Sequence, residues 1–273
     1  KINKQNIKFL IKMKLFLKEY LSADNKLSVL NKYKKIQIET AKNFCFQNDI
    51  PIRDIYKDSN YIKLLQNTSR KDYIKTFFKP KSNIDLNKLH ISLEGMYSIS
   101  HWKDNEKILN YLNNLKYNYK NATLIDATAN VGGISLYMSL YFKKVVAVEL
   151  NYLNYKMLKH NIKIYKSQNI EALLGESTNL IPKIINDYKK TIVLIDPPWG
   201  GLDYKENKVI DLYLGDMNVY EFIDYIIDSV EMVILKAPFN YNLLHFKEII
   251  KYKIDILNLK KYQIIFVFNE ISI

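Results

Sequence analysis

The sequence predicts an α/β fold in which a mostly parallel, seven-stranded sheet carries helices on both faces. Short apolar runs typical of buried strands alternate along the chain with longer segments of helical periodicity. The first five of these strands are separated by helices and therefore form a parallel sheet, whereas the last two are expected to close it as an antiparallel pair. In chain order, the expected strands are 122–125, 145–150, 170–174, 192–195, 232–235, 254–257 and 262–268.

Helices are expected between these strands, where apolar residues recur at the spacing of a helix that packs one face on a sheet. One helix precedes the first strand, at 104–115, and the next follows a glycine-containing turn and ends near Phe142. The remaining helices are expected at 152–165, 219–230 and 243–250.

Residues 1–85 differ from the rest of the chain, and we expect them to form a helical amino-terminal extension to an α/β domain at 86–273. The segment 79–83 is the best candidate linker, because it combines a proline with small and polar residues. The many lysines of residues 1–85 suit either contact with RNA phosphates or a solvated face of packing helices. Helical patterns occur at about 7–20, 27–46 and 54–78.

The composition points to a polyanionic partner. The formal net charge of the 273-residue chain is +13, as expected for a protein that binds nucleic acid. Nearly all of that charge is lysine, since Arg53 and Arg70 are the only arginines. Lys, Asn, Ile and Tyr have A/T-rich codons, so part of the charge reflects genome composition, as in an A/T-rich parasite or a large virus.

Several classes are excluded by what the sequence lacks. Cys45 is the only cysteine, so there is no disulfide framework or cysteine-based metal site, and a reducing compartment is indicated. The four histidines have no ligand spacing, and no metal is expected. No apolar run reaches membrane-spanning length and no signal peptide is evident. We expect a soluble, intracellular monomer in the nucleus or the cytoplasm, without a membrane partner.

The segment Asp196–Gly201 follows the fourth strand and reads Asp-Pro-Pro-Trp-Gly-Gly. Its prolines end the strand and stiffen the loop, and its glycines allow another molecule to approach closely. Asp196 and Trp199 are therefore presented at the carboxyl end of a strand, where open α/β sheets bind ligands. Such a segment can stack on a planar base and hold its exocyclic amine. Taken alone, it is equally consistent with a strand-ending turn around a buried Trp.

The turn after the first strand, Asp126–Gly133, favours the functional interpretation. Its small residues and glycines let the backbone lie against a ligand at a helix amino terminus. Asn130 stands where a glycine is commoner, and asparagine tolerates the left-handed conformation better than most residues. Glu149 ends the second strand beside this turn, where a carboxylate can accept hydrogen bonds from both hydroxyls of a ribose.

Glu176 ends the third strand and can accept a hydrogen bond from an adenine amino group, whereas the neighbouring Ser177 has the alternative role of capping the next helix. Acidic residues thus follow four consecutive strands. Together they predict a site for S-adenosylmethionine beside a site for a methyl acceptor.

Over residues 86–268 the chain resembles the trimethylguanosine synthase family, which methylates N2 of the 7-methylguanosine cap of RNA. The family segment Ser/Asp-Pro-Pro-Trp-Gly-Gly-Pro-x-Tyr matches DPPWGGLDY at 196–204. Three further family segments match in the same order: EGMYSIS at 94–100, the turn at 126–133, and HNIKIY at 160–165. The resemblance implies a Rossmann-like class I methyltransferase fold.

The resemblance also implies a role for each matching residue. Trp199 stacks on the cationic 7-methylguanine, Asn161 bonds an edge of that base, and Asp196 with the carbonyl of Pro197 orients the amine for methyl transfer. Tyr204 and Lys236 complete the substrate side. The family carries a basic phosphate ligand where this chain has Phe239, and its substitute is Lys236 or a lysine of the amino-terminal helices. The cofactor is implied to contact Ser100, Asp126, Thr128, Gly132, Glu149, Glu176, Ser177 and Asp196.

Other readings remain open. An N6-adenine methyltransferase also carries Asp-Pro-Pro-Trp, although in RNA adenosine enzymes that segment usually precedes the cofactor turn. Ribosomal RNA guanine-N2 methyltransferases share the segment order found here, but usually carry Tyr or Phe at the position of Trp199. A third reading is an inactive cap-binding or RNA-binding subunit of methyltransferase fold. Asn130 and the missing phosphate contact favour that reading, whereas the intact acids at the strand ends oppose it.

Overall fold

The computed structural model describes residues 71–91, 98–185 and 190–269. All of these lie in the second of two compact units of the chain, Leu65–Ile273. The helices expected at 7–20 and 27–46 fall outside the described residues. No helix in the described ranges is long and apolar enough to cross a membrane.

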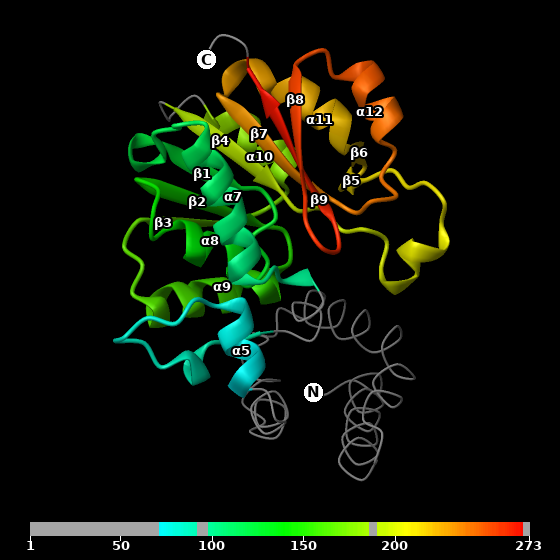
Figure 1. Ribbon diagram of the computed structural model, residues 1–273. Coiled ribbons are helices and arrows are strands. Elements are labelled where there is room, and N and C mark those ends of the chain that lie inside the picture. The colour runs from blue at the N-terminus through cyan, green and yellow to red at the C-terminus, as the bar shows by residue number, and fades with distance from the viewer. Residues whose placement is uncertain (1–70, 92–97, 186–189, 270–273) are drawn as a thin grey trace, which may run out of the picture. The chain divides into compact units, whose positions relative to one another are not determined.

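Seven strands form one sheet with the order β3-β2-β1-β4-β7-β9-β8 (Figure 1). The first five strands of this order are parallel, and β9 is antiparallel to both β7 and β8. The predicted doubly wound sheet and its antiparallel closing pair are therefore confirmed. The strands are β1 Thr123–Asp126, β2 Lys144–Glu149, β3 Ile170–Leu174, β4 Thr191–Ile195, β7 Met232–Ala237, β8 Lys253–Asn258 and β9 Gln263–Phe268.

Three helices cover each face of the sheet (Figure 1). Every residue of β1, β4, β7 and β9 is buried, because successive side chains of a strand point to opposite faces and here both faces are covered. One face carries α7 Trp102–Asn114, α8 Gly133–Met138 and α9 Tyr152–Tyr165, and the other α10 Ser177–Ile184, α11 Val219–Ile226 and α12 Leu243–Ile249.

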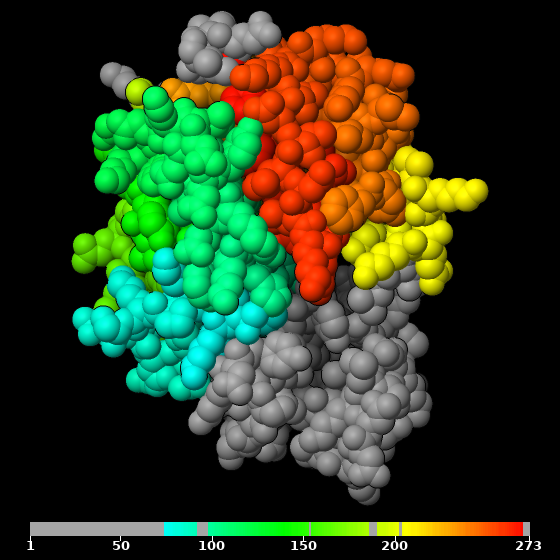
Figure 2. Space-filling view, viewed as in Figure 1, coloured from blue at the N-terminus to red at the C-terminus, as the bar shows by residue number. Residues whose placement is uncertain are grey.

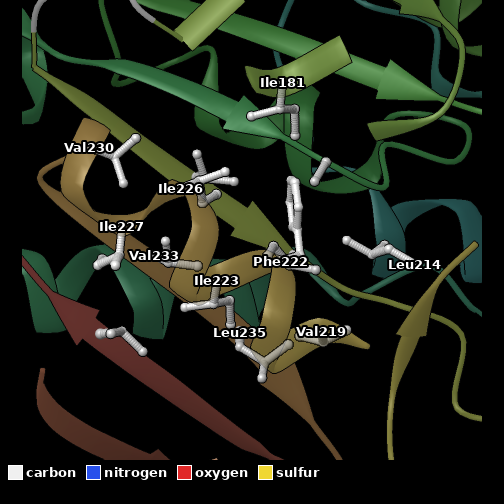
Figure 3. Close-up of a cluster of buried hydrophobic side chains, with 14 of the residues drawn as sticks. Ile181, Leu214, Val219, Phe222, Ile223, Ile226, Ile227, Val230, Val233 and Leu235 are labelled. Atoms are coloured by element: carbon white, nitrogen blue, oxygen red, sulfur yellow. The ribbon is translucent and has the colours of Figure 1, made fainter. Parts of the chain in front are cut away.

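The second face holds the larger of the hydrophobic clusters (Figure 3). Phe222 and Ile223 of α11 are fully buried and pack on Val233 and Leu235 of β7. The amino terminus of α11 is closed by a capping box, in which Asn218 and Glu221 each bond the other's backbone. This packing holds β7 and β4 side by side, so that the residues after these two strands meet at one edge.

The closing strands are also fastened to the first face. Tyr111 of α7 stacks on Phe266 of β9 with ring centroids 4.1 Å apart, and its hydroxyl donates to Asp255 of β8 at 2.6 Å. Figure 2 shows the resulting contact, where the red carboxy-terminal strands lie against the green segment that contains α7.

The segment between β4 and α11 contains elements that the sequence did not predict. A 3₁₀ helix, η4 Leu202–Glu206, lies on the yellow loop that projects at the right of Figures 1 and 2. It is followed by a hairpin of two-residue strands, β5 Tyr213–Leu214 and β6 Met217–Asn218. Elements this short contain too few residues to show a period. The other short helices are η1 Leu86–Lys88, η2 Tyr119–Asn121 and η5 Ile227–Ser229.

Residues that the sequence assigns to the amino-terminal extension pack on the sheet domain. The helix α5 Lys71–Phe77 receives a hydrogen bond from Trp102 Nε1 on its Lys75 carbonyl, at 2.9 Å. The carbonyl of Lys79 likewise accepts a bond from the Tyr165 hydroxyl, at 2.7 Å. Because the compact unit starts at Leu65, we propose that the domain boundary lies near that residue instead of at residue 85.

Candidate active site

The carboxyl end of β1 provides a buried carboxylate. Asp126 is fully buried, and its Oδ2 accepts a hydrogen bond of 2.5 Å from the Ser135 hydroxyl of α8. Its Oδ1 accepts from the backbone of Thr128 at 3.3 Å. Burial raises the pKa of Asp126 to about 7, with a smaller contribution from the nearby carboxylates of Asp196 and Glu149.

The turn after β1 has the geometry that its sequence predicts. Asn130 lies in the left-handed region at φ 50°, as does Gly132 at φ 97° immediately before α8. The backbone of Asn130 donates to Glu149 Oε2 at 2.6 Å, and Asn151 donates to Oε1 of the same carboxylate at 2.7 Å. Glu149 therefore fixes the turn and lies directly beside it. Asn130 Oδ1 is buried and accepts no hydrogen bond from the described residues.

Gly133 positions the segment that carries Ser100. A Cβ atom at Gly133 would lie 2.4 Å from Cγ1 of the buried Ile99 side chain, so the helix start and this segment are in contact only because residue 133 has no side chain.

We expect Gly133→Ala to destabilise the domain by about 1–3 kcal/mol, because the overpacking outweighs the gain in helix propensity. Chemical denaturation measures this loss. The matched control is Gly133→Ala with Ile99→Ala, in which the added methyl has room, so the double variant should lose less than the sum of the single losses. Additive losses would contradict the contact.

The end of β4 is joined to both neighbouring strands. The backbone N–H of Asp196 donates to Thr128 Oγ1 at 2.8 Å, which ties β4 to the turn after β1. On the other side, Lys236 of β7 donates to Asp196 Oδ2 at 2.6 Å and to Ser100 Oγ at 2.7 Å. Ser100 Oγ in turn lies 3.4 Å from the same carboxylate oxygen. Burial raises the pKa of Asp196, and the Lys236 ammonium opposes that shift.

Trp199 is half-buried and lies beside this cluster. Its ring packs edge-on against Tyr204 and Tyr262, at centroid distances of 5.3 and 5.8 Å, and the Lys236 ammonium lies 5.2 Å from its centroid. The indole Nε1 is buried without a hydrogen-bond partner among the described residues. The indole ring is thus not fully buried in the core, and it does not face away from Asp196.

The loop that carries the indole is partly rigid and partly open. Pro197 is buried, whereas Pro198 and Gly200 are exposed. Gly200 and Gly201 have φ values of 88° and 94°, and a Cβ on either would have no described atom within 4 Å. The two glycines therefore have open space around them among the described residues.

The structure corrects the role predicted for Asn161. Its side chain is fully buried, and its amide bonds the His90 backbone N–H and carbonyl at 2.7 and 2.8 Å and the Val131 carbonyl at 2.8 Å. These bonds use the carbonyl oxygen and both N–H groups of the amide. Asn161 therefore joins α9 to the turn after β1, and this arrangement does not fit a contact with a base edge.

Lys236 is likewise occupied. Its ammonium is buried with Asp196 and Ser100 and lies over two aromatic rings, so the predicted contact with cap phosphates does not fit this arrangement. Ser177 donates to the Ala127 carbonyl and is the first residue of α10, preceded by Glu176 at the N-cap. The hydrogen bond of Ser177 supports the turn after β1, and Ser177 does not cap α10.

Glu176 lies beneath the β5-β6 hairpin. A Cβ at Gly215, in the turn of that hairpin, would lie 1.9 Å from Glu176 Oε1, and Glu176 Oε2 accepts a hydrogen bond from Asn179 at 2.8 Å. This contact was not predicted from the sequence, because the hairpin itself carries no periodic signal.

Tyr262 was not predicted as a site residue either. It is buried, contacts Trp199, and donates to Asp104 at 2.8 Å. Among the described residues, no group of three or more His, Cys, Asp or Glu side chains is arranged to hold a metal.

The sheet order, with an antiparallel strand inserted between β7 and β8 and acidic residues ending β1 and β2, defines a class I methyltransferase. The chain belongs to the family of RNA cap guanine-N2 methyltransferases, whose model matches residues 121–269, more than half of its length. The resemblance inferred from the sequence is thus confirmed.

Individual relatives cover different shares of the chain. An uncharacterized protein of Acanthamoeba polyphaga mimivirus, L320, is 29% identical over 240 residues, which span 80% of this chain and 93% of that protein. The trimethylguanosine synthase of Schizosaccharomyces pombe is 30% identical over 103 residues, spanning 36% of this chain and 41% of the synthase. The precorrin-6y C5,15-methyltransferase of Geobacter metallireducens superposes with a TM-score of 0.49, at 14% identity over 69% of this chain and 97% of that enzyme.

Proposed function

We propose that this protein transfers a methyl group from S-adenosylmethionine to the exocyclic N2 of the 7-methylguanosine cap of RNA. The observation that carries the proposal is the position of Trp199, beside Asp196 and next to the turn that Asp126 and Glu149 support. An aromatic face, an acceptor for an amine and a glycine-containing turn at a helix start are the three parts that such a reaction needs. Family membership supports the same reaction.

The residues around the turn fit S-adenosylmethionine. Glu149 is held beside the turn by two backbone N–H groups, at the end of the second strand, where a carboxylate in this kind of fold accepts hydrogen bonds from ribose hydroxyls. The buried Asn130 Oδ1 has no partner among the described residues, and a donor on the cofactor would satisfy it. A Cβ at Gly132 would lie 2.8 Å from Leu158 Cδ1, so this position of the turn requires glycine. The cofactor supplies an electrophilic methyl carbon on a sulfonium.

The acceptor is positioned by the segment after β4. Trp199 stacks on the base, and a cationic 7-methylguanine gains more from this contact than neutral guanine does. Asp196 and the Pro197 carbonyl accept hydrogen bonds from the amine and aim its lone pair at the methyl group. Bound S-adenosylmethionine would supply the methyl group that this lone pair attacks, and the proton that the amine loses would pass to solvent. Rate enhancement in this scheme comes mainly from positioning two reactants.

Capped RNA is the partner we propose. The net charge of +13 favours a polyanion, and the cap is the part of an RNA that the stacking residue selects. Because Lys236 is paired with Asp196, we assign the cap phosphates to no residue of the described chain.

Incubation with labelled S-adenosylmethionine tests the proposal. Methyl transfer to 7-methylguanosine triphosphate is expected, with much lower transfer to guanosine triphosphate, and mass spectrometry of the product should place the label on N2. Asp196→Ala should abolish transfer. Equal transfer to both nucleotides would contradict recognition of the cationic base.

The same assay separates the alternatives. Transfer to adenosine oligonucleotides or to ribosomal RNA fragments, with none to the cap nucleotide, would favour another base-amine methyltransferase. Cap binding without measurable affinity for S-adenosylmethionine in calorimetry would favour an inactive binding subunit.

A further inference from the structure

Lys236 makes an unusual set of contacts for a lysine. It lies on the central strand β7, only 8% exposed, where lysine is rarely found unless it is paired. Its ammonium donates to Asp196 Oδ2 at 2.6 Å and to Ser100 Oγ at 2.7 Å. The same ammonium lies 5.2 Å from the centroid of Trp199 and 4.7 Å from that of Tyr262. One charged group thus touches the acceptor residue, the segment before α7 and the stacking residue.

The two oxygens of Asp196 are used differently. Oδ2 takes both Lys236 and Ser100, whereas Oδ1 accepts no hydrogen bond from the described residues. The backbone of Asp196 is anchored by Thr128 at 2.8 Å. A carboxylate with a fixed backbone and one fixed oxygen has its plane set, so its second oxygen is a preorganised acceptor.

The surroundings make this arrangement depend on the lysine. The side chain of Asp196 is 11% exposed, and its partial burial raises its pKa. Asp126 of β1 is close enough for the two carboxylates to repel one another. The other ionisable groups near the pair are Tyr262, His101, Lys261 and Asp104, and the pKa of His101 is lowered by burial and by nearby cations. Lys236 is the cation that lies in hydrogen-bond contact with the carboxylate.

Protonation would change the chemistry of Asp196. A protonated carboxyl carries an O–H donor, whereas orienting an amine that must present its lone pair to a methyl group requires an acceptor for the amine hydrogens. The ionised form is therefore the useful one, and the nearest opposite charge favours it.

We propose that Lys236 is a positioning residue for the methyl transfer, which holds Asp196 ionised and oriented with Oδ1 free for the substrate amine. This inference rests on the proposed function for its consequence in catalysis. It assigns Lys236 a role through Asp196, in place of the phosphate contact that the sequence suggested.

The first test compares pH profiles of kcat for Lys236→Met and Lys236→Arg. Methionine keeps the length of the side chain without its charge, so the Asp196 pKa should rise, and kcat should fall at neutral pH and recover by up to tenfold per pH unit above it. Arginine keeps the charge, so the profile should match wild type even where the amplitude is lower. In an Asp196→Ser background, Lys236→Met should cause little further loss, since the two residues act as one unit.

A second test requires no substrate. An acid whose pKa is raised by folding loses stability as the pH rises from its unfolded toward its folded pKa. The Tm deficit of Lys236→Met against wild type should therefore grow as the pH rises above the ordinary pKa of an aspartic acid, to roughly 5 °C or more. Lys236→Met with Asp196→Ser should show no such growth. This result is expected whether or not the cap is the substrate, so failure of the proposed function would not conceal it.

Two outcomes would overturn the proposal. One is a Tm deficit of Lys236→Met that is the same at every pH. The other is a pair of results: the pH profile of kcat for Lys236→Met matches wild type, and Lys236→Met raises the KM for the cap nucleotide by the same factor in the wild-type and Asp196→Ser backgrounds. That pair would indicate that Lys236 contacts the substrate directly.

Discussion

Trp199→Ala is expected to lower kcat/KM for methyl transfer to 7-methylguanosine triphosphate by about 100-fold or more, while leaving the Kd for S-adenosylmethionine unchanged. Stacking on an aromatic side chain is worth about 1–3 kcal/mol per base, and a cation over a desolvated indole adds about 2 kcal/mol. Each 1.4 kcal/mol is a factor of ten. Because the half-buried ring lies beside the Lys236–Asp196 pair, both contributions are expected at the proposed acceptor site and none at the turn proposed to bind the cofactor.

The chain offers matched controls for this experiment. Trp199→Phe keeps an aromatic face and should retain part of the activity. Trp102 is the only other tryptophan, and its Nε1 donates to the Lys75 carbonyl. Quenching of fluorescence by the cap nucleotide should therefore survive in Trp102→Phe and disappear in Trp199→Phe. Full activity of Trp199→Ala would remove the basis for cap stacking.

Glu149→Gln is expected to weaken binding of S-adenosylmethionine by about 10- to 100-fold. Both carboxylate oxygens accept backbone N–H groups, from Asn130 and Asn151, so an amide must turn its NH₂ toward one of two donors. A hydrogen bond to a charged group contributes about 1.5–3 kcal/mol. The substitution therefore weakens the support of the turn and also the acceptor proposed for the ribose. Calorimetry measures the affinity directly.

Glu171→Gln is the control for this substitution. Glu171 lies on the neighbouring strand β3 and forms an exposed ion pair of 2.7 Å with Lys144, which contributes little to stability. Cofactor affinity should be unchanged in this variant. An affinity of Glu149→Gln equal to that of Glu171→Gln would place the cofactor away from the end of β2.

The secondary structure that was predicted well is the buried sheet. Strand β3 was predicted to the residue, and β1 and β4 to within one residue at either end. Apolar runs bounded by turn residues leave little freedom in placing such strands. The elements that were missed, η4 and the β5-β6 hairpin, are too short for periodicity and are stabilised by contacts with distant residues such as Glu176.

The residues of the candidate site likewise fall into those that could be placed from the sequence and those whose partners could not be predicted from it. Asp126, Glu149, Asp196 and Trp199 were expected at strand ends and in the loop that follows, where the structure has them, because such positions are readable in sequence order. Their contacts with ligands stay predictions. Asn161 and Ser177 were assigned to ligands but bond the backbone of the turn after β1. An isolated polar residue carries no mark that shows whether its partner is a ligand or a carbonyl elsewhere in the chain.

The sequence by itself determined the class of fold, the order of the acidic strand ends and the position of the Asp-Pro-Pro-Trp segment after β4, because these depend on local pattern and on residues that are close in the chain. The tertiary structure alone decided that Lys236 pairs with Asp196 across two strands and that Tyr262 packs on Trp199. Both contacts join segments far apart in sequence. Their existence depends on the order in which the strands assemble, since that order sets which strand ends become neighbours.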